Sequence, residues 1–289
     1  MGDMKYTRRQ FKADFPDESA CLQYLFDLRF GPDFKCEKCG RSGKFKRTKN
    51  RRTFTCGCGK RQVSPTAGTI FNKSEIPLED YFLTIFLMSQ GKNGMAATEI
   101  ARIVGCEYKT ALSMSRRIRS LMRFGSSPFS GTVEVDETYI GGRRHGKRGR
   151  GAAGKTAVFG ISNRDTGKVF AKAVPNVRAK TVMPLIRENV KIGSTVMTDE
   201  MASYKRSKEH GYNHHTVRHS AGEYVRGNVY TNSIEGFWGQ LKRSVDGTYH
   251  AVSPAHLQEY VDEHVFRWNH RNSPVHLFHL LLSEVVRPS

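Results

Sequence analysis

The spacing of apolar residues divides the chain into two parts with different expected structure. In the first part, apolar side chains recur every three or four positions, which predicts helices over residues 15–30, 76–88, 95–104 and 109–122. The helix at 76–88 has Pro77 followed by acidic residues in its first turn, a combination typical of a helix start. Gly105 separates the last two helices, so the pattern predicts a helix–turn–helix pair.

Beyond the linker-like sequence at 126–128, short runs of β-branched residues replace the helical spacing. These runs predict strands over residues 132–140, 156–162, 168–174, 194–199 and 213–218. Helical spacing returns over residues 178–190, 201–209, 233–245 and 254–269. Three strands joined by short connections, followed by strands that alternate with helices, predict a mixed α/β sheet.

The charge of the chain narrows the class of partner. Its 289 residues carry a formal net charge of +20 with a pI near 9.9, and lysine and arginine recur along the whole length. Such a positive electrostatic field favours binding to a polyanion, either nucleic acid or an anionic membrane surface. No apolar run approaches the roughly 18 residues that cross a bilayer, and the first residues lack the apolar core of a signal peptide. We therefore expect an intracellular protein that acts on nucleic acid, with no membrane partner.

Two basic segments are candidates for contact with DNA. The second helix of the helix–turn–helix pair carries Lys109, Arg116, Arg117 and Arg119. An ordinary helical bundle with surface arginines is the alternative for this region. The glycine-rich loop at 141–155 also holds cations that suit phosphates, and its spacing does not match a P-loop. They are Arg143, Arg144, Lys147, Arg148 and Arg150.

Four of the six cysteines follow the spacing of a zinc site. Cys36 and Cys39 form one pair, Cys56 and Cys58 form a second, and a basic stretch of sixteen residues separates the pairs. Paired cysteines on two glycine-rich turns predict a zinc ribbon with one tetrahedral structural Zn²⁺ ion. The second pair has one intervening residue rather than two, which tightens that turn. The alternative is a loop of reduced cysteines without metal, since disulfides are not expected inside the cell.

Three acidic residues lie in contexts that suit a second kind of metal site. Asp136 and Asp199 each close a β-branched run, and Glu235 opens an amphipathic helical pattern. Carboxylates from two strands and a helix can converge on divalent cations, as metal-assisted phosphoryl transfer requires. The alternative is a set of solvated acids at element ends. Glu134 shares the strand face of Asp136, whereas Glu137 points the other way, and both are predicted to be structural.

The helix that carries Glu235 adds further candidates. Asn232 lies three residues before Glu235 and Lys242 seven residues after it, so all three share one helix face. Lys242 on that face is expected either to contact DNA phosphates or to be a solvated lysine. Trp238 is predicted to anchor the core, with stacking on an unpaired base as the alternative.

These motifs and their order resemble the DDE transposases of bacterial insertion sequences, and most of all the zinc-ribbon family numbered fifteen-ninety-five in the insertion-sequence scheme. Behind the ribbon, the segments that carry the likeness are 62–71 (QVSPTAGTIF), 135–142 (VDETYIGG) and 232–242 (NSIEGFWGQLK). The resemblance implies an RNase H-like catalytic fold in which Asp136, Asp199 and Glu235 hold two Mg²⁺ ions, with Mn²⁺ as a substitute. Some relatives carry asparagine at the third acidic position, which makes Asn232 the alternative ligand.

The resemblance also implies a division of labour along the chain. Residues 1–66 would form an N-terminal helix and the zinc ribbon, residues 67–127 a helix–turn–helix-like DNA-binding domain, and residues 128–289 the catalytic domain. Such an enzyme binds terminal inverted repeats, cleaves the 3′ ends of the element and joins them to target DNA. Its partners are these two double-stranded DNAs and, in the synaptic complex, at least a second copy of the chain. A cytoplasmic, nucleoid-associated location in a prokaryote is expected.

Two other functions stay open at the level of sequence. One is a structure-selective nuclease of the same fold that cuts DNA without joining strands. The other is a DNA-binding regulator that uses the ribbon and the helix–turn–helix pair, with the carboxylates in structural roles.

Overall fold

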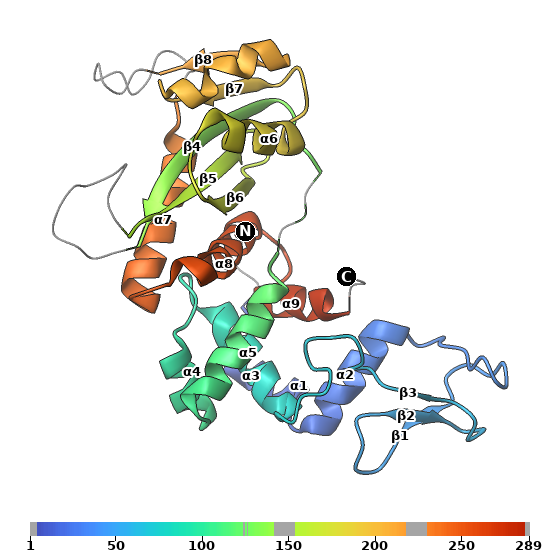
Figure 1. Cartoon of the computed structure of the whole chain (residues 1–289). Coiled ribbons are helices and arrows are strands. Elements are labelled where there is room, and N and C mark those ends of the chain that lie inside the picture. Colours follow the sequence, from blue (N-terminus) through green and yellow to red (C-terminus); the bar gives the residue numbers. More distant parts are fainter. Residues whose placement is uncertain (1–4, 124, 126, 142–153, 218–229, 287–289) are drawn as a thin grey trace. The chain divides into compact units, whose positions relative to one another are not determined.

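The structure is a computed structural model of the chain, and it describes residues 5–123, 125, 127–141, 154–217 and 230–286 (Figure 1). The chain divides into two compact units. Unit 1 comprises Met1–Gly91, Met95–Leu121 and Ser273–Ser289, and unit 2 comprises Lys92–Gly94 and Met122–Asn272. Unit 1 therefore combines segments from both ends of the sequence.

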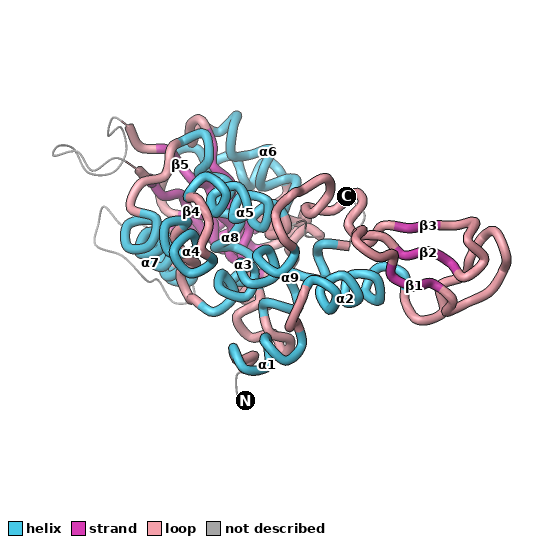
Figure 2. The backbone as a smooth tube through the Cα atoms, turned by 90° about the horizontal axis from the view of Figure 1, so that it is seen from below, coloured by secondary structure: helices cyan, strands magenta, loops and turns pink. Residues whose placement is uncertain are grey.

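A small antiparallel sheet forms one part of unit 1. Its strands are β1 (Phe45–Arg47), β2 (Phe54–Cys56) and β3 (Gln62–Val63), in the order β1-β2-β3. Figure 2 draws these three short strands next to α2 (Glu18–Phe30). Phe26 of α2 stacks on Phe54 of β2 with ring centroids 4.2 Å apart. The helix therefore supplies the apolar cover that so short a sheet needs for stability.

The rest of unit 1 is helical. Besides α2, its helices are α1 (Arg8–Asp14), α3 (Leu78–Gln90), α4 (Ala97–Val104), α5 (Tyr108–Ser120) and α9 (Leu277–Val285). Residues 105–107 join α4 to α5, and Gly105 ends α4 in the left-handed conformation with φ 80°. The short glycine turn between two helices is therefore present as the sequence predicts.

The last helix of the chain packs among the first ones. The ring of Phe278 on α9 lies 5.6 Å from that of Phe15 and 6.2 Å from that of Phe86 on α3. Neither α1 nor α9 was predicted from the spacing of apolar residues. The division at residues 66 and 127 remains a prediction, and α9 lies in unit 1 although the expected catalytic domain runs to residue 289.

Unit 2 is built on a five-stranded mixed sheet. Its strands are β4 (Thr132–Ile140), β5 (Thr156–Asn163), β6 (Val169–Val174), β7 (Thr195–Thr198) and β8 (Asn213–Thr216). The order across the sheet is β6-β5-β4-β7-β8. The pairs among β4, β5 and β6 are antiparallel, whereas β7 runs parallel to β4 and β8 parallel to β7. This mixed α/β sheet confirms the predicted fold class, and its order and strand directions are those of an RNase H-like domain.

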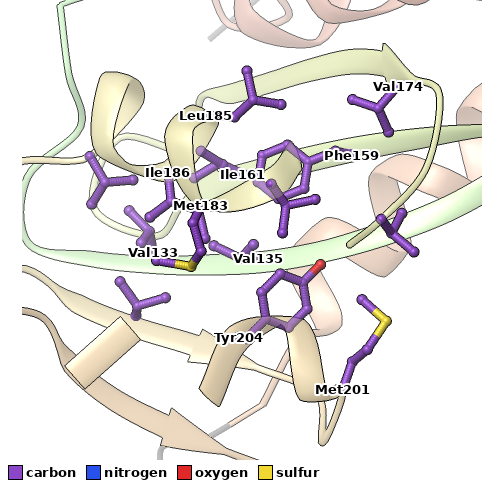
Figure 3. Packing of buried hydrophobic residues seen from close by; sticks show 14 of the residues in the cluster. Val133, Val135, Phe159, Ile161, Val174, Met183, Leu185, Ile186, Met201 and Tyr204 are labelled. Carbon is purple, nitrogen blue, oxygen red and sulfur yellow. The ribbon is translucent and has the colours of Figure 1, made fainter. Parts of the chain in front are cut away.

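Helices cover both faces of this sheet and create two separate apolar cores. On one face, α6 (Ala179–Asn189) and the 3₁₀ helix η1 (Ala202–His210) pack over Val133 and Val135 of β4 (Figure 3). On the other face, α7 (Asn232–Ser244) and α8 (Leu257–Asn269) pack over Ile140. The short turns η3 (Val245–Tyr249) and η4 (Pro254–His256) connect these two helices. Because side chains alternate along a strand, the even-numbered residues of β4 face α7.

Candidate active site

Two of the predicted acids lie side by side on neighbouring parallel strands. In the pairing of β4 with β7, Val135 stands opposite Thr198. The next residues along the two strands are Asp136 and Asp199, which the same register places next to each other. Asp136 lies inside β4, which continues to Ile140, whereas Asp199 directly follows the end of β7. The two carboxylates therefore lie near the end of the shorter strand, close enough for the charge of Asp199 to help raise the pKa of Asp136.

A tryptophan from α7 holds the first of these carboxylates. Nε1 of Trp238 donates a hydrogen bond of 3.0 Å to Oδ2 of Asp136. Gly160 of β5 stands opposite Asp136, and a Cβ atom added at this glycine would lie 2.6 Å from the Trp238 ring. The glycine therefore makes room for the indole against the sheet. Trp238 is 4% exposed, which confirms it as a core anchor and leaves no face for stacking on a base.

Burial and neighbouring charge make ionisation of Asp136 unfavourable. Burial raises the pKa of its carboxyl group to about 7, and the negative charges of Glu137 and Asp199 add to this, against hydrogen bonds from the Glu137 backbone and Trp238. Glu137 faces the opposite side of the sheet, where its Oε2 accepts a hydrogen bond of 2.8 Å from the hydroxyl of Tyr204. Three carboxylates thus concentrate negative charge here, and a divalent cation bound between Asp136 and Asp199 would relieve their repulsion.

The third predicted acid lies in the first turn of α7. Glu235 is exposed, and its Oε1 accepts a hydrogen bond of 2.8 Å from the Thr231 hydroxyl. Asn232 and Lys242 are exposed on the same helix, at the predicted spacing of three and seven residues. The carboxylates of Asp136, Asp199 and Glu235 do not form a cluster with ligand atoms within 4.8 Å of one another. The structure thus brings Asp199 near Asp136 and places Glu235 at the start of α7, the helix that packs on β4 and β5.

The four ribbon cysteines do form such a cluster. Among the described residues, Cys36, Cys39, Cys56 and Cys58 are the only group of potential ligands within 4.8 Å of one another. The sulfur of Cys36 lies 3.8 Å from that of Cys58, and the sulfur of Cys39 lies 3.7 Å from that of Cys56. A tetrahedron with Zn–S bonds of about 2.3 Å has S···S edges of about 3.8 Å. The cluster therefore fits one tetrahedral Zn²⁺ ion. The single residue between Cys56 and Cys58 does not prevent both sulfurs from joining it.

The basic residues predicted to contact DNA divide into three groups. On α5, Lys109 and Arg117 are exposed and Arg116 is half-buried, and together with Leu112 and Ser113 they line a shallow groove of about 380 Å³. Arg117 also donates a hydrogen bond of 3.0 Å to the carbonyl of Ile70.

Arg119 is a correction to this prediction, because its side chain is 1% exposed. The helical period explains the difference, since Arg119 follows Ile118 on the apolar side of α5. The loop residues Arg143, Arg144, Lys147, Arg148 and Arg150 lie outside the residues that the structure describes.

Comparison with known proteins gives two matches to family models. Residues 16–61 match a model described as a transposase zinc-ribbon domain, and residues 128–269 match a model described as an ISXO2-like transposase domain. The first segment includes all four clustered cysteines, and the second includes all three predicted acids. In the described part of the chain, no helix has the length and apolarity needed to cross a membrane.

Two relatives extend this similarity. An uncharacterized transposase-like protein of Haemophilus influenzae is 32% identical over 122 residues, which are 42% of this chain and 96% of the relative. An uncharacterized protein in transposable element ISH50 of Halobacterium salinarum is 25% identical over 271 residues, which cover 86% of this chain and 89% of the relative. With both domain models matched in the expected order and one relative covered almost completely, the chain belongs to the zinc-ribbon family of insertion-sequence transposases, IS1595, and carries its DDE transposase domain.

Proposed function

We propose that this chain binds the terminal inverted repeats of an insertion sequence, cleaves the 3′ ends of the element and joins them to target DNA. The observation that carries the proposal is the proximity of Asp199, which directly follows β7, to Asp136 of β4, the strand on which the Glu235-bearing helix α7 packs. This arrangement lies in the segment that matches an insertion-sequence transposase domain.

The chemistry of the site suits Mg²⁺, for which Mn²⁺ can substitute. Asp136 and Asp199 offer oxygen ligands, the donor type that hard cations prefer. Burial, with added repulsion from Glu137 and Asp199, raises the pKa of Asp136 to about 7, and a divalent charge would favour its ionised form. Two Mg²⁺ ions, held by Asp136, Asp199 and Glu235, would supply activation of the attacking oxygen and stabilisation of the leaving 3′ oxygen.

The protein groups around the acids orient them and the DNA. Trp238 fixes Oδ2 of Asp136, and Thr231 holds Oε1 of Glu235, so each carboxylate keeps a defined rotamer before cations bind. Lys242 lies on the exposed face of α7 and pairs with a phosphate of the bound DNA strand. With these groups in place, a water molecule first cuts the element end, and the freed 3′ hydroxyl then attacks target DNA.

Recognition of the element ends belongs to unit 1. The groove along α5 carries Lys109, Arg116 and Arg117. A second groove, rich in basic residues, lies at the turn between β1 and β2. That groove has a volume of about 470 Å³ and is lined by Glu18, Arg47, Lys49, Asn50, Arg51 and Arg52. Zn²⁺ bound by the four cysteines keeps the ribbon folded and this turn in place. Because transposition handles two ends, we expect at least a dimer in the DNA complex.

The test is a pair of assays on the same DNA ends. We expect Asp136→Asn, Asp199→Asn and Glu235→Gln each to lower end cleavage, and joining of pre-cleaved ends, by roughly a thousandfold or more, without additivity, because one missing ligand dismantles the site. Binding of end DNA should be unchanged. Glu188→Gln, an exposed acid on α6, is the matched control. Cleavage that persists in Asp136→Asn contradicts the assignment.

The wild-type protein separates the competing functions in the same assays. Cleavage without joining of pre-cleaved ends indicates a nuclease. Specific binding of end DNA with neither reaction, in Mg²⁺ and in Mn²⁺, indicates a DNA-binding regulator.

A further inference from the structure

A second buried carboxylate lies two residues before Asp136 on the same face of β4. Glu134 is fully buried, with no exposed surface. Its Oε1 accepts a hydrogen bond of 2.6 Å from Nε of Arg164, and its Oε2 accepts bonds of 2.8 Å and 3.0 Å from the backbone amides of Ser233 and Ile234. These contacts join β4 to the first turn of α7, about one hundred residues further along the chain.

Glu134 acts as the cap of α7. The first amides of a helix have no partner within the helix, and the residue before it usually supplies one. Thr231 precedes α7 and makes no such side-chain bond, since its hydroxyl donates to Glu235 instead. The Glu134 carboxylate satisfies two of these amides, and its negative charge suits the positive end of the helix dipole. The position of β4 therefore decides where α7 begins.

Arg164 completes the connection from the next strand. It directly follows β5 and donates a hydrogen bond of 2.6 Å to the carbonyl of Tyr230, just before α7. Its guanidinium group lies 3.5 Å from the centre of the Tyr230 ring. Arg164 thus holds the chain that leads into the helix, while it neutralises Glu134.

A buried ion pair of this kind is weak evidence for stability, because desolvation opposes the attraction between the charges. The ion pair instead fixes geometry, because Arg164 donates to one oxygen of Glu134 and the first amides of α7 donate to the other. The distance between the strand bearing Asp136 and the helix bearing Glu235 is set at this contact, one residue before Glu235 itself. Misplacement of reacting groups by about 1 Å lowers rates on the order of a hundredfold.

We infer that Glu134 and Arg164 are positioning residues that set the place of Glu235 relative to Asp136, and so build the divalent-cation site from β4 and α7. This inference rests on the proposed function, because it requires that these acids bind the cation. Glu134→Gln tests it with little change in size. One end of the glutamine amide is a donor, so it opposes either Arg164 or the helix amides, and one side of the connection is lost.

The primary readout is Mn²⁺ binding to the DNA-free protein, followed by electron paramagnetic resonance. We expect Glu134→Gln and Arg164→Lys to weaken this binding about tenfold to a hundredfold. Both variants should keep end-DNA binding. Their half-maximal Mn²⁺ concentration for cleavage should rise in parallel.

The matched control is Glu263→Gln. Glu263 and Arg267 on α8 form another buried ion pair of the same unit, with Nη2 of Arg267 2.7 Å from Oε1 of Glu263. Glu263 also accepts a hydrogen bond of 2.8 Å from the Tyr249 hydroxyl of η3, so this control removes a buried charge and leaves the contacts of Glu134 with the first turn of α7 in place. Its Mn²⁺ affinity should stay within twofold of wild type. Arg164→Lys keeps the charge and remains informative if Glu134→Gln does not fold. Mn²⁺ affinities of both variants equal to that of Glu263→Gln overturn the inference, whereas a wild-type protein that binds no Mn²⁺ contradicts the proposed function instead.

Discussion

Nε1 of Trp238 and Oδ2 of Asp136 form a hydrogen bond of 3.0 Å between residues that are 102 positions apart. Trp238 lies one turn after Glu235 on α7, so the helix that carries the third acid also orients the first. The bond exists because Gly160 leaves space for the indole on β5. Asp136 accepts this donor through Oδ2, which fixes the plane of its carboxylate against the sheet.

Removal of this donor should reduce catalysis while the core stays packed. Trp238→Phe keeps an aromatic ring over Gly160 but lacks the N–H group. We expect end cleavage and Mn²⁺ affinity to fall about tenfold to a hundredfold, as for other groups that orient metal ligands. Trp268→Phe is the control, since Nε1 of Trp268 donates a hydrogen bond of 3.0 Å to the carbonyl of Gly167 and none to the predicted metal ligands. Equal cleavage by the two variants contradicts a positioning role for Trp238.

The raised pKa of Asp136 predicts an effect of pH on stability. Burial is the main cause of its rise from 3.8 to about 7. Between these values the folded state holds more protons than the unfolded state, so stability from this group is present at pH 4 and lost as the pH rises through 7. Without Mg²⁺ or Mn²⁺, Asp136→Asn should therefore melt at a higher temperature than wild type at pH 8, and the difference should vanish near pH 4.

Tryptophan fluorescence can follow this transition in unit 2 alone. The chain has two tryptophans, Trp238 and Trp268, and both lie in unit 2. Addition of Mg²⁺ at pH 8 should stabilise wild type but not Asp136→Asn, because only the carboxylate binds the ion. A wild-type protein as stable as the variant at pH 8, in the absence of divalent cations, contradicts the raised pKa.

The zinc site predicts a fixed metal content. Purified protein should contain about one Zn²⁺ ion per chain by elemental analysis, and Cys36→Ser should lose it, since zinc binding contributes directly to the folding of such small ribbons. Binding of end DNA should weaken at the same time. Cys106→Ser is the control, because Cys106 lies outside the cysteine cluster. A folded wild-type protein without zinc would end the zinc hypothesis.

The face of α5 predicts the salt dependence of DNA binding. Arg116→Ala with Arg117→Ala should weaken binding of end DNA and flatten the plot of log affinity against log salt by about one unit per lost phosphate contact. Arg9→Ala with Lys12→Ala removes two exposed charges from α1 and should leave the slope near that of wild type. Arg119→Ala should instead lower the melting temperature, because Arg119 is buried. An unchanged slope in the first double variant contradicts a DNA-contacting α5.

Local patterns predicted the elements of the five-stranded sheet well, and the reason is visible in β4. The run 132–140 alternates because Val133, Val135 and Tyr139 enter the apolar core under α6, whereas the even-numbered residues face α7, and its bounds match those of β4. Asp136 and Asp199 were predictable because each closes a β-branched run, and Glu235 because it opens an amphipathic helical pattern. The segment 201–209 was predicted as an ordinary helix and is the 3₁₀ helix η1. The spacing of apolar residues in this segment does not distinguish an α-helix from a 3₁₀ helix.

Contacts between distant segments were not predictable in this way. Glu134 was recognised as a structural acid, but nothing near it in sequence indicates Arg164 or the first turn of α7 as its partners. The sequence around Gly160 does not indicate why a glycine is required there either. The requirement comes from the Trp238 ring, which packs against Gly160 from α7. Arg119 was assigned to the DNA-binding face by its charge, whereas its place on the helix buries it. Long-range packing decides the partners of Glu134 and Gly160, and hydrophobic periodicity carries no information about it. The helical period of α5, by contrast, already groups Arg119 with the buried residues of that helix.

The remaining choice in the active site is between Glu235 and Asn232 as the third ligand. Both are exposed on the first turn of α7, three residues apart on one face. A carboxylate binds a hard cation better than an amide does, and Oε1 of Glu235 is already held 2.8 Å from the Thr231 hydroxyl. We therefore expect Glu235→Gln to abolish cleavage in both Mg²⁺ and Mn²⁺.

Asn232→Ala should retain cleavage within a few-fold of wild type, and Thr231→Val should lower it by about tenfold through a freed Glu235 carboxylate. Gln240→Ala, an exposed residue further along α7, controls for changes on the helix surface. Each variant is measured for cleavage, for joining of pre-cleaved ends and for Mn²⁺ affinity without DNA. Loss of all three in Asn232→Ala, together with an active Glu235→Gln, would transfer the ligand role to Asn232. The Thr231 hydroxyl would then orient a carboxylate that acts outside the cation site.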